Sequence, residues 1–417
     1  MSHRRGACPS LFAPMETGDG LLVRLYPAER RLSGCQLAGL ARAARRFGNG
    51  VLEITARGSL QIRGLTAKSA AALAAEVEVL AIEASSGVAV ETGPLAGLDA
   101  SEIADPRPLA REIRKRIEAM GLSTILGPKV SVTVDGGGAL GLGEIIADVK
   151  LEAIAAAEGG AKECGAQGRA AWLWLIRVGG ASATARIIGC FDEKTAADVT
   201  IQLLEAVSQR GLTARARDLS DQDLQAIAGA APIPNDRWST HARLPIGRFG
   251  LIGGERALGF VLPYGQVESD ALYEFAQAIG ENAELRLAPG RGLIVLDTAT
   301  REDDLLAPAE KLGLVTRPDD PRLSIAVCAG KPACASAHLA TKQLAERLLA
   351  RRPELFDGAF RLHLSGCEKQ CARPSGPSVT LIGTENGHRI STEAAAPSPE
   401  LKALLAELAA EQRRQTA

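Results

Sequence analysis

The sequence predicts an α+β fold in which a strand–helix–strand–strand–helix (βαββα) half-domain occurs twice, together with two further α/β domains. Two observations predict it. The first is an internal repeat of this element order, and the second is a pair of cysteine motifs that each follow an apolar strand near the C-terminus. Because one βαββα unit leaves an apolar sheet face uncovered, we expect the two copies to pair around a pseudo-two-fold axis and bury it.

The repeat consists of two stretches with the same element order. Alternating apolar residues predict strands, and apolar residues every three to four positions predict helices. Residues 20–79 read as strand 20–27, helix 33–48, strand 51–57, strand 59–65 and helix 67–78. Residues 256–313 read as strand 256–263, helix 268–282, strand 283–290, strand 291–298 and helix 301–313. The alternative is a chance similarity between two ordinary α/β segments.

Proline-bearing segments indicate where domains join. GAAPIPNDRW (229–238) and TRPDDPR (316–322) have the composition of such joints. Between the copies the pattern predicts an Arg-rich helix, several strands and a long helix, with the glycine run DGGGALGLGE (135–144) as a hairpin. We therefore predict half-domains at 1–82 and 236–316, and α/β domains at 83–235 and 317–417, the last bearing the cysteine motifs.

Composition limits the class of function. The chain has 417 residues and a formal net charge of −1, with Lys and Arg spread throughout, so there is no electrostatic footprint for nucleic acid. No run of about eighteen apolar residues could span a membrane, and the first residues lack the apolar segment of a signal peptide. We expect a cytoplasmic protein with no nucleic-acid or membrane partner. Thiols stay reduced there, so the eight cysteines are not read as a disulfide framework.

Four cysteines form two close pairs. Cys328 and Cys334 have C-x5-C spacing, and Cys367 and Cys371 have C-x3-C spacing. Both pairs follow an apolar strand that ends in small residues, which suits thiolates converging from loops onto an iron–sulfur cluster. Structural zinc is the rival, although it prefers C-x2-C to C-x4-C spacing. A third reading is four unrelated core cysteines. The spacing favours a cluster held by these four residues.

The cysteine motifs also carry a resemblance. CAGKPACASA (328–337) followed by HLSGCEKQCARP (363–374) resembles the cluster motif of the sulfite and nitrite reductase hemoprotein family. The resemblance implies two ferredoxin-like half-domains, each followed by a cluster-type or tetrapyrrole-type α/β domain. It also implies a [4Fe-4S] cluster on the four cysteines.

Other segments resemble one branch of this family, which converts precorrin-3A to precorrin-3B in aerobic cobalamin biosynthesis. These segments are RGACPSLFAPM (5–15), TGDGLLVRL (17–25) and SGCEKQCA (365–372). The resemblance implies an O2-dependent monooxygenase that hydroxylates a meso carbon and closes a γ-lactone. It further implies a mononuclear non-heme iron, no siroheme, and an external electron donor, either a ferredoxin or an NADH-dependent reductase.

The resemblance also suggests substrate-binding residues. The family pattern T-x-R-x-x-x-Q is present as Thr55, Arg57 and Gln61, so Arg57 matches an active-site arginine. Arg24 resembles a second such arginine, and Lys129 one member of a lysine pair. Arg63 is the remaining candidate for binding tetrapyrrole carboxylates, which suit Arg and Lys donors.

One departure from the family pattern bears on the substrate. Ser131 stands where the spacing would place the second lysine of the pair. Fewer cations weaken the case for reduction of a small oxyanion. A siroheme-containing sulfite or nitrite reductase nevertheless stays the alternative function, and a non-catalytic precorrin-binding or electron-transfer protein is the second alternative.

The ligands of the mononuclear iron and the catalytic residues cannot be assigned from the sequence. A facial site needs two histidines and a carboxylate, and none of the five histidines has metal-ligand spacing. His363, on the strand before Cys367, is the strongest candidate, although its alternating position also suits the core.

Overall fold

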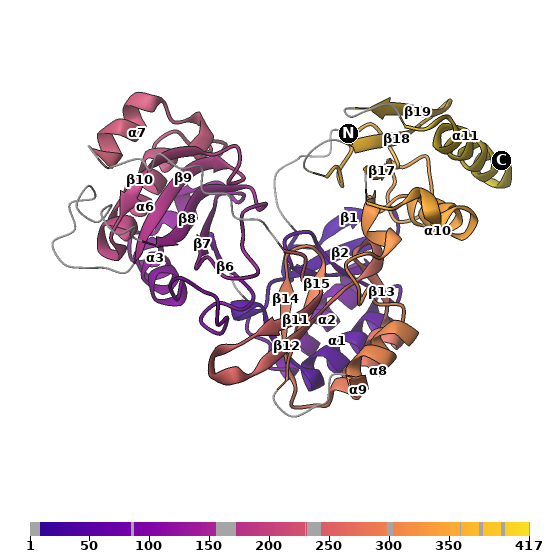
Figure 1. The fold of residues 1–417 in the computed structure, drawn as a ribbon, viewed down its shortest axis with the longest axis horizontal. Helices are drawn as coiled ribbons and strands as arrows, with labels where there is room; N and C mark the ends of the chain where they lie inside the picture. The colour runs from indigo at the N-terminus through magenta and orange to yellow at the C-terminus, as the bar shows by residue number, and fades with distance from the viewer. Residues whose placement is uncertain are drawn as a thin grey trace.

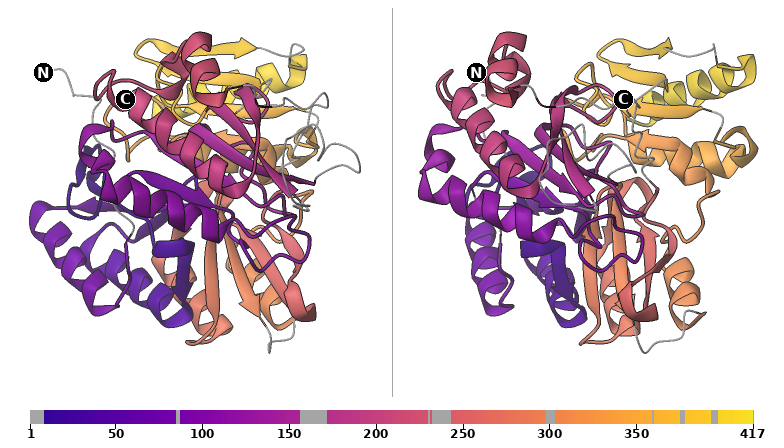
Figure 2. Two further views of the ribbon diagram at one scale, coloured as in Figure 1. Left: turned by 90° about the vertical axis from the view of Figure 1, so that its left-hand side faces the viewer. Right: turned by 60° about the vertical axis from the view of Figure 1, so that its left-hand side comes forward.

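The computed structural model describes residues 9–84, 87–155, 172–229, 231, 243–297, 303–358, 360–374, 378–392 and 397–416. These residues form three five-stranded sheets, one four-stranded sheet and the helices that cover them (Figure 1). Two of the five-stranded sheets form a central pair, and the two α/β domains lie on opposite sides of it. Turned views show both α/β domains at the same end of the central pair (Figure 2). The predicted α+β fold class is confirmed.

The first central sheet has the strand order β1-β2-β5-β4-β13, and all neighbouring strands are antiparallel. Its last strand comes from the second copy of the repeat. There β13 (Gln266–Glu268) pairs with the start of β4 (Val51–Ile54). The other strands are β1 (Met15–Thr17), β2 (Gly20–Leu25) and β5 (Leu60–Leu65).

The second central sheet, β11-β12-β15-β14-β3, mirrors this arrangement. Here β3 (Arg31–Ser33), from the first copy, pairs with β14 (Glu284–Ala288). The remaining strands are β11 (Gly247–Gly250), β12 (Arg256–Val261) and β15 (Gly292–Asp297). Each copy thus lends one short strand to the sheet of the other, and this reciprocal strand exchange joins the two half-domains.

Each exchanged strand follows a tight turn. The turn η1 (Ala28–Arg30) precedes β3, and η4 (Pro263–Gly265) precedes β13. Both turns place two successive residues at positive φ: Glu29 at 51° and Arg30 at 59° in the first, Tyr264 at 58° and Gly265 at 80° in the second. Glycine enters this region without steric cost, whereas Glu, Arg and Tyr must be held there by their surroundings.

The helices of the two half-domains pack against each other. Helix α1 (Gly34–Phe47) begins with a capping box between Ser33 and Gln36, and it contacts α8 (Ser269–Ile279) of the other copy. Leu37 and Leu40 on α1 are completely buried in the core that both copies share. The outer helices are α2 (Ala67–Val79) and α9 (Asp303–Lys311). The apolar face of each half is therefore buried by the other, as the repeat predicts.

The first α/β domain has the strand order β10-β9-β8-β7-β6, with β6, β7 and β8 parallel. Helices α3 and α6 pack on one face. The strands are β6 (Ala89–Thr92), β7 (Ser131–Asp135), β8 (Ala147–Ala155), β9 (Trp172–Gly180) and β10 (Arg186–Phe191). The helices are α3 (Arg107–Ala119), α4 (Leu122–Ile125), α6 (Glu193–Ser208) and α7 (Asp221–Ala228).

The glycine run 135–144 is not the predicted hairpin, because it connects two parallel strands, β7 and β8. The Asp135 carboxylate accepts hydrogen bonds from the N–H groups of Gly137 and Leu142 and holds the loop in a compact coil. A side chain, and not a two-residue turn, therefore organises this segment.

The C-terminal domain has the sheet order β16-β17-β18-β19, parallel from β16 to β18 and antiparallel at β19. Helices α10 (Thr341–Arg351) and α11 (Pro399–Thr416) contact each other and share an apolar core with the sheet. The strands are β16 (Ile325–Val327), β17 (Arg361–Ser365), β18 (Ser378–Thr384) and β19 (Gly387–Thr392). The residue boundaries of the four domains stay a prediction. Within the described residues, no helix combines the length and the apolar character needed to cross a membrane.

Candidate functional site

The two cysteine motifs lie at the same edge of the C-terminal sheet. Cys328 follows β16 and Cys367 follows β17, and these neighbouring strands are parallel, so their carboxyl ends meet. The two loops also bond to each other. The Cys328 N–H donates to the Leu364 carbonyl at 3.2 Å, and the Gly366 N–H donates to the Cys328 Sγ at 3.1 Å. The parallel pairing of β16 and β17 thus brings together two cysteine motifs that are separate in the sequence.

The Cys371 thiol lies within electrostatic reach of the other three motif cysteines. The pKa of the Cys371 thiol is raised first by burial and then by the negative charges of Cys367, Cys328 and Cys334, with Lys369 opposing. Charges act this way only over short distances, so the four side chains gather in one region. Thiolates that repel one another are stabilised when iron binds them, which is the chemistry of a cluster site.

Small residues permit the close approach of the cysteine loops. A Cβ on Gly366 would lie 2.7 Å from the Ala337 Cβ, and Gly330 at φ 61° has no room for a Cβ against Thr341. The Thr341 hydroxyl in turn donates to the Cys328 carbonyl at 2.7 Å. The first turn of α10 and the first cysteine loop are therefore locked together.

The two candidate metal groups, a zinc ion and a four-iron cluster, need different separations of the cysteine sulfurs. Among the described residues, no group of three or more His, Cys, Asp or Glu side chains is arranged to hold one metal ion. A tetrahedral zinc site needs sulfurs about 3.8 Å apart, since each Zn–S bond is about 2.3 Å. A four-iron cluster spreads its thiolates more widely. Ligation of a cluster by the four cysteines stays a prediction.

Arg63 connects the first half-domain to the Cys334 loop. Its Nη2 donates to the Ala333 carbonyl at 2.6 Å, and its other nitrogens bond to Asp19 and Glu53. Burial disfavours its charge, but the two carboxylates outweigh burial and raise the pKa of Arg63. All three nitrogens are thus bonded to protein atoms, so a substrate carboxylate would have to displace one of these partners.

Arg24 lies on β2 of the first central sheet, and Arg57 lies in the turn between β4 and β5. Arg24 donates to the Gln61 Oε1 through Nε and Nη2 (3.2 and 2.8 Å) and is half-buried. Arg57 is 35% exposed and reaches out of its own half-domain, with Nη1 donating to the Ile146 carbonyl at 2.8 Å. Arg57 and Gln61 of the predicted pattern are therefore present on one hairpin but face different neighbours.

Arg57 contacts Ser131, the position where the family pattern has the second lysine of the pair. Its Nη2 lies 3.5 Å from the Ser131 hydroxyl and 3.2 Å from the Glu91 Oε2. Ser131 is buried on β7. Lys129, two residues earlier, is exposed and makes no hydrogen bond or ion pair with the described residues. The structure thus brings Arg57 and Ser131 together, while Lys129 projects into solvent. The roles of all four cations in substrate binding stay a prediction.

The sequence analysis missed Lys150 on the neighbouring strand. In the sheet register Lys150 lies beside Thr133, and it is completely buried. Its Nζ donates to the carbonyls of Leu142 and Ile145 at 2.8 and 3.0 Å. Burial lowers the pKa of Lys150, and Arg57 is among the cations that lower it further. The alternating polar residues of ADVKLEAIA (147–155) were the available signal that this strand has a polar face.

His363 is completely buried on β17, with Nδ1 3.4 Å from the Thr380 hydroxyl and Nε2 without a partner. Burial, with help from Arg373 and Arg291, lowers the pKa of His363 to about 4, so the ring is neutral at neutral pH. A neutral buried ring can accept a hydrogen bond or ligate a metal, but no second or third ligand accompanies it among the described residues. His3 and His241 lie outside the described residues.

Comparison with known proteins places this site in a family. A precorrin-3B synthase from Sinorhizobium sp. is 40% identical over 402 residues, which cover 95% of this chain and 84% of that protein. The chain belongs to the nitrite and sulfite reductase family. The family model of the nitrite/sulfite reductase ferredoxin-like half domain matches residues 13–80.

Other members of the nitrite and sulfite reductase family are more distant. Sulfite reductase [ferredoxin] 1 from Mycolicibacterium paratuberculosis is 23% identical over 89% of this chain and 72% of that protein. The solved structure of the Mycobacterium tuberculosis NirA protein superposes with a TM-score of 0.70 at 19% identity, over 89% of this chain and 73% of that chain. The shared fold therefore extends through both half-domains and both α/β domains.

Proposed function

We propose that the protein is a precorrin-3B synthase, an O2-dependent monooxygenase that converts precorrin-3A to precorrin-3B in aerobic cobalamin biosynthesis. The observation that carries this proposal is the 40% identity to a precorrin-3B synthase over 95% of the chain. The serine beside Arg57 supports it, because Ser131 replaces a cation that a small, highly charged oxyanion substrate would need.

The side chains of this protein would bind and orient the substrate. Precorrin-3A carries several carboxylates, and arginines bind carboxylates through paired N–H donors. Arg57 is the best placed candidate because it is partly exposed and its Nε makes no hydrogen bond with the described residues, whereas all three nitrogens of Arg63 are bonded. Holding the ring A acetate close to the hydroxylated carbon would favour lactone closure, because an oriented intramolecular reaction avoids the entropy of bringing two molecules together.

The cofactors would supply the electrons and the oxygen activation when they are bound. Cys328, Cys334, Cys367 and Cys371 would hold the [4Fe-4S] cluster. Among the described residues, no group of three His, Cys, Asp or Glu side chains is arranged to hold the mononuclear iron. The sulfite reductase relative is named for ferredoxin, which supports an external ferredoxin as the electron donor, with an NADH-dependent reductase as the alternative.

The test is an assay of reconstituted protein with precorrin-3A and a reductant, with and without O2. We expect a product heavier by one oxygen atom, formed only with O2 and labelled by ¹⁸O2. Binding of precorrin-3A without an O2-dependent product would support the non-catalytic alternative and overturn the proposal. Acid–acetone extraction of iron-replete protein provides a second check, since stoichiometric siroheme would identify a sulfite or nitrite reductase instead.

A further inference from the structure

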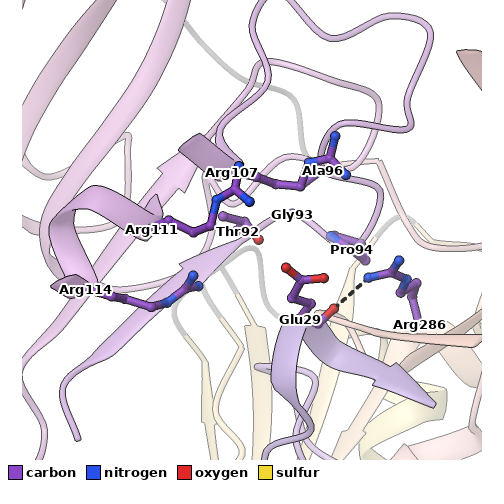
Figure 3. Close-up of a pocket in the computed structure, with 9 residues that line it drawn as sticks. All are labelled: Glu29, Thr92, Gly93, Pro94, Ala96, Arg107, Arg111, Arg114 and Arg286. Carbon is purple, nitrogen blue, oxygen red and sulfur yellow. Dashed lines mark hydrogen bonds between the residues drawn. The ribbon is translucent and has the colours of Figure 1, made fainter. Parts of the chain in front are cut away.

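A pocket lined by arginines lies where the first α/β domain meets the central pair of sheets (Figure 3). It is a shallow site, and the roughly 330 Å³ of space between its walls includes space that is open to solvent. Arg107, Arg111 and Arg114 enter it from α3, Arg286 from β14 and Glu29 from the turn η1. The main chain that follows β6, from Thr92 to Pro94, completes the lining. None of these residues belongs to the site proposed for precorrin.

The three helical arginines share one face of α3. Their spacing of four and three residues stacks them on successive turns. Arg107 pairs with Asp105, but Arg111 makes no hydrogen bond or ion pair with the described residues and is exposed. Arg114 donates to the Val90 carbonyl at 2.6 Å. Burial, and then the charge of Arg111, lowers the pKa of Arg114, with Glu29 opposing. The helix face therefore carries positive charge that protein carboxylates only partly balance.

Arg286 faces these arginines from the opposite wall. Its Nη1 donates to the Glu29 carbonyl at 3.0 Å, and Nη2 pairs with Glu284. Its Nε is buried and has no hydrogen-bond partner, although the side chain is 12% exposed. A buried donor without an acceptor is costly and is usually satisfied by a water or a ligand. This nitrogen has almost no exposed surface, so an acceptor in the pocket would bond to it only after the Arg286 side chain moves.

Glu29 is the only carboxylate among the residues that line the pocket. Its side chain extends toward the helical arginines (Figure 3) but lies within ion-pair distance of none of the described cations. Its backbone has a positive φ of 51° in the turn η1. Glu29 thus acts as a weak internal counter-ion, and a bound anion would compete with it.

We propose that this pocket binds a small multivalent oxyanion of the phosphate class. The pocket is too small for a tetrapyrrole macrocycle, and arginine forks bind the oxygens of tetrahedral anions well. The anion bridges Arg111 and Arg114 of the α/β domain to Arg286 of the central sheets. It therefore ties two parts of the fold together and stabilises the folded chain by mass action.

The pocket also borders the hairpin that carries Arg57. The Thr92 carbonyl, in the pocket wall, accepts a hydrogen bond from the Arg30 Nε at 3.3 Å. The same Arg30 donates to the Arg57 carbonyl at 2.6 Å, and Glu91 pairs with both arginines. An anion in the pocket would thus contact the structure that positions the Arg57 loop.

The experiment uses the full chain with its cluster reconstituted and inorganic phosphate as the probe, at constant ionic strength. Titration calorimetry should show one saturable phosphate site, and thermal unfolding should shift upward with phosphate. The double substitution Arg111→Gln, Arg114→Gln should weaken binding about tenfold or more, because two charged donors to the anion are lost. Lys115→Gln removes one positive charge from an exposed position on α3 and should bind phosphate as the wild type does.

Glu29→Gln should change phosphate affinity in the opposite direction to the double arginine variant, because it removes the competing carboxylate. Phosphate should bind this variant several-fold more tightly, a gain that misfolding cannot produce. The proposal is overturned if the wild type shows no saturable phosphate binding, if the double variant binds as well as Lys115→Gln, or if succinate binds better than phosphate.

Discussion

The N–H of Gly290 donates a hydrogen bond of 2.9 Å to the carbonyl of Ala56, so the tips of the β4–β5 and β14–β15 hairpins touch. Each tip carries an arginine next to this contact. Arg57 points into the first α/β domain. Arg291, at φ 68°, is held in a buried setting where desolvation lowers its pKa and Glu53 opposes that effect. Each repeat therefore has one arginine, Arg57 or Arg291, next to the contact between the two hairpin tips.

We expect substitution of Arg57 to weaken substrate binding. Arg57→Gln removes a charged donor but keeps a polar side chain of similar length, so the KM for precorrin-3A should rise about tenfold or more, with a smaller change in kcat. Steady-state kinetics measure both. Arg45→Gln is the control, because Arg45 forms an exposed ion pair with Asp270 on the helices. An unchanged KM for Arg57→Gln would remove this residue from the proposed site.

Each of the four motif cysteines should be required for the cluster. Cys328→Ser or Cys371→Ala should abolish the visible absorption of the cluster and reduce its acid-labile sulfide, whereas Cys35→Ser, at an exposed position outside the motifs, should change neither. Iron and sulfide analysis after anaerobic reconstitution measures the effect. Retention of a full cluster by Cys371→Ala would show that the ligand set is different.

The stability of the protein should fall as the pH falls from about 6.5 toward 4, in part because of His363. The pKa of His363 is lowered to about 4 in the folded protein, while the unfolded chain binds the proton at an ordinary pKa. The unfolded state therefore binds more protons in this range, so acid favours unfolding. His363→Gln should make the melting temperature depend less on pH between these limits. His338→Gln, on a partly exposed loop, should retain the wild-type slope. Equal slopes in all three proteins would contradict the prediction.

The exchanged strands should couple the stability of the two half-domains. Leu32 lies on β3, is completely buried and pairs with Leu285 of the other copy. Leu32→Ala should destabilise the central pair by about 2–5 kcal/mol, the usual cost of such a cavity. Calorimetry should show both half-domains melting together at a lower temperature. Leu212→Ala, at a 61% exposed position, should have little effect. Separate melting of the two halves would argue against coupling.

The fold was predictable where it depends on local patterns. The βαββα repeat is visible because its helices and long strands are amphipathic. The exchanged strands β3 and β13 were not predictable from the sequence. Each has three residues, which is too few for a periodic signal, and each pairs with a strand of the other copy. The loop after β7 was mispredicted because the Asp135 side chain, and not a turn sequence, determines its path.

The candidate site also has parts that the sequence predicts and parts that depend on contacts between distant residues. The meeting of the cysteine loops follows from two strands that each precede a cysteine, which the sequence shows. The surroundings of Arg63 do not follow, because its acceptor Ala333 is 270 residues away in the chain. Lys150 was missed because its place beside Thr133 depends on the register of two parallel strands.

The reciprocal strand exchange also affects how the chain is made. During synthesis, β3 leaves the ribosome long before β14, its partner near residue 285, exists. At about 5–20 residues per second, the first half-domain waits roughly ten to fifty seconds with an open sheet edge and an uncovered apolar face. Such an edge is a template for wrong pairing between nascent chains. We therefore expect the yield of soluble protein in a foreign host to depend on translation speed and on chaperones that cover this half until its counterpart arrives.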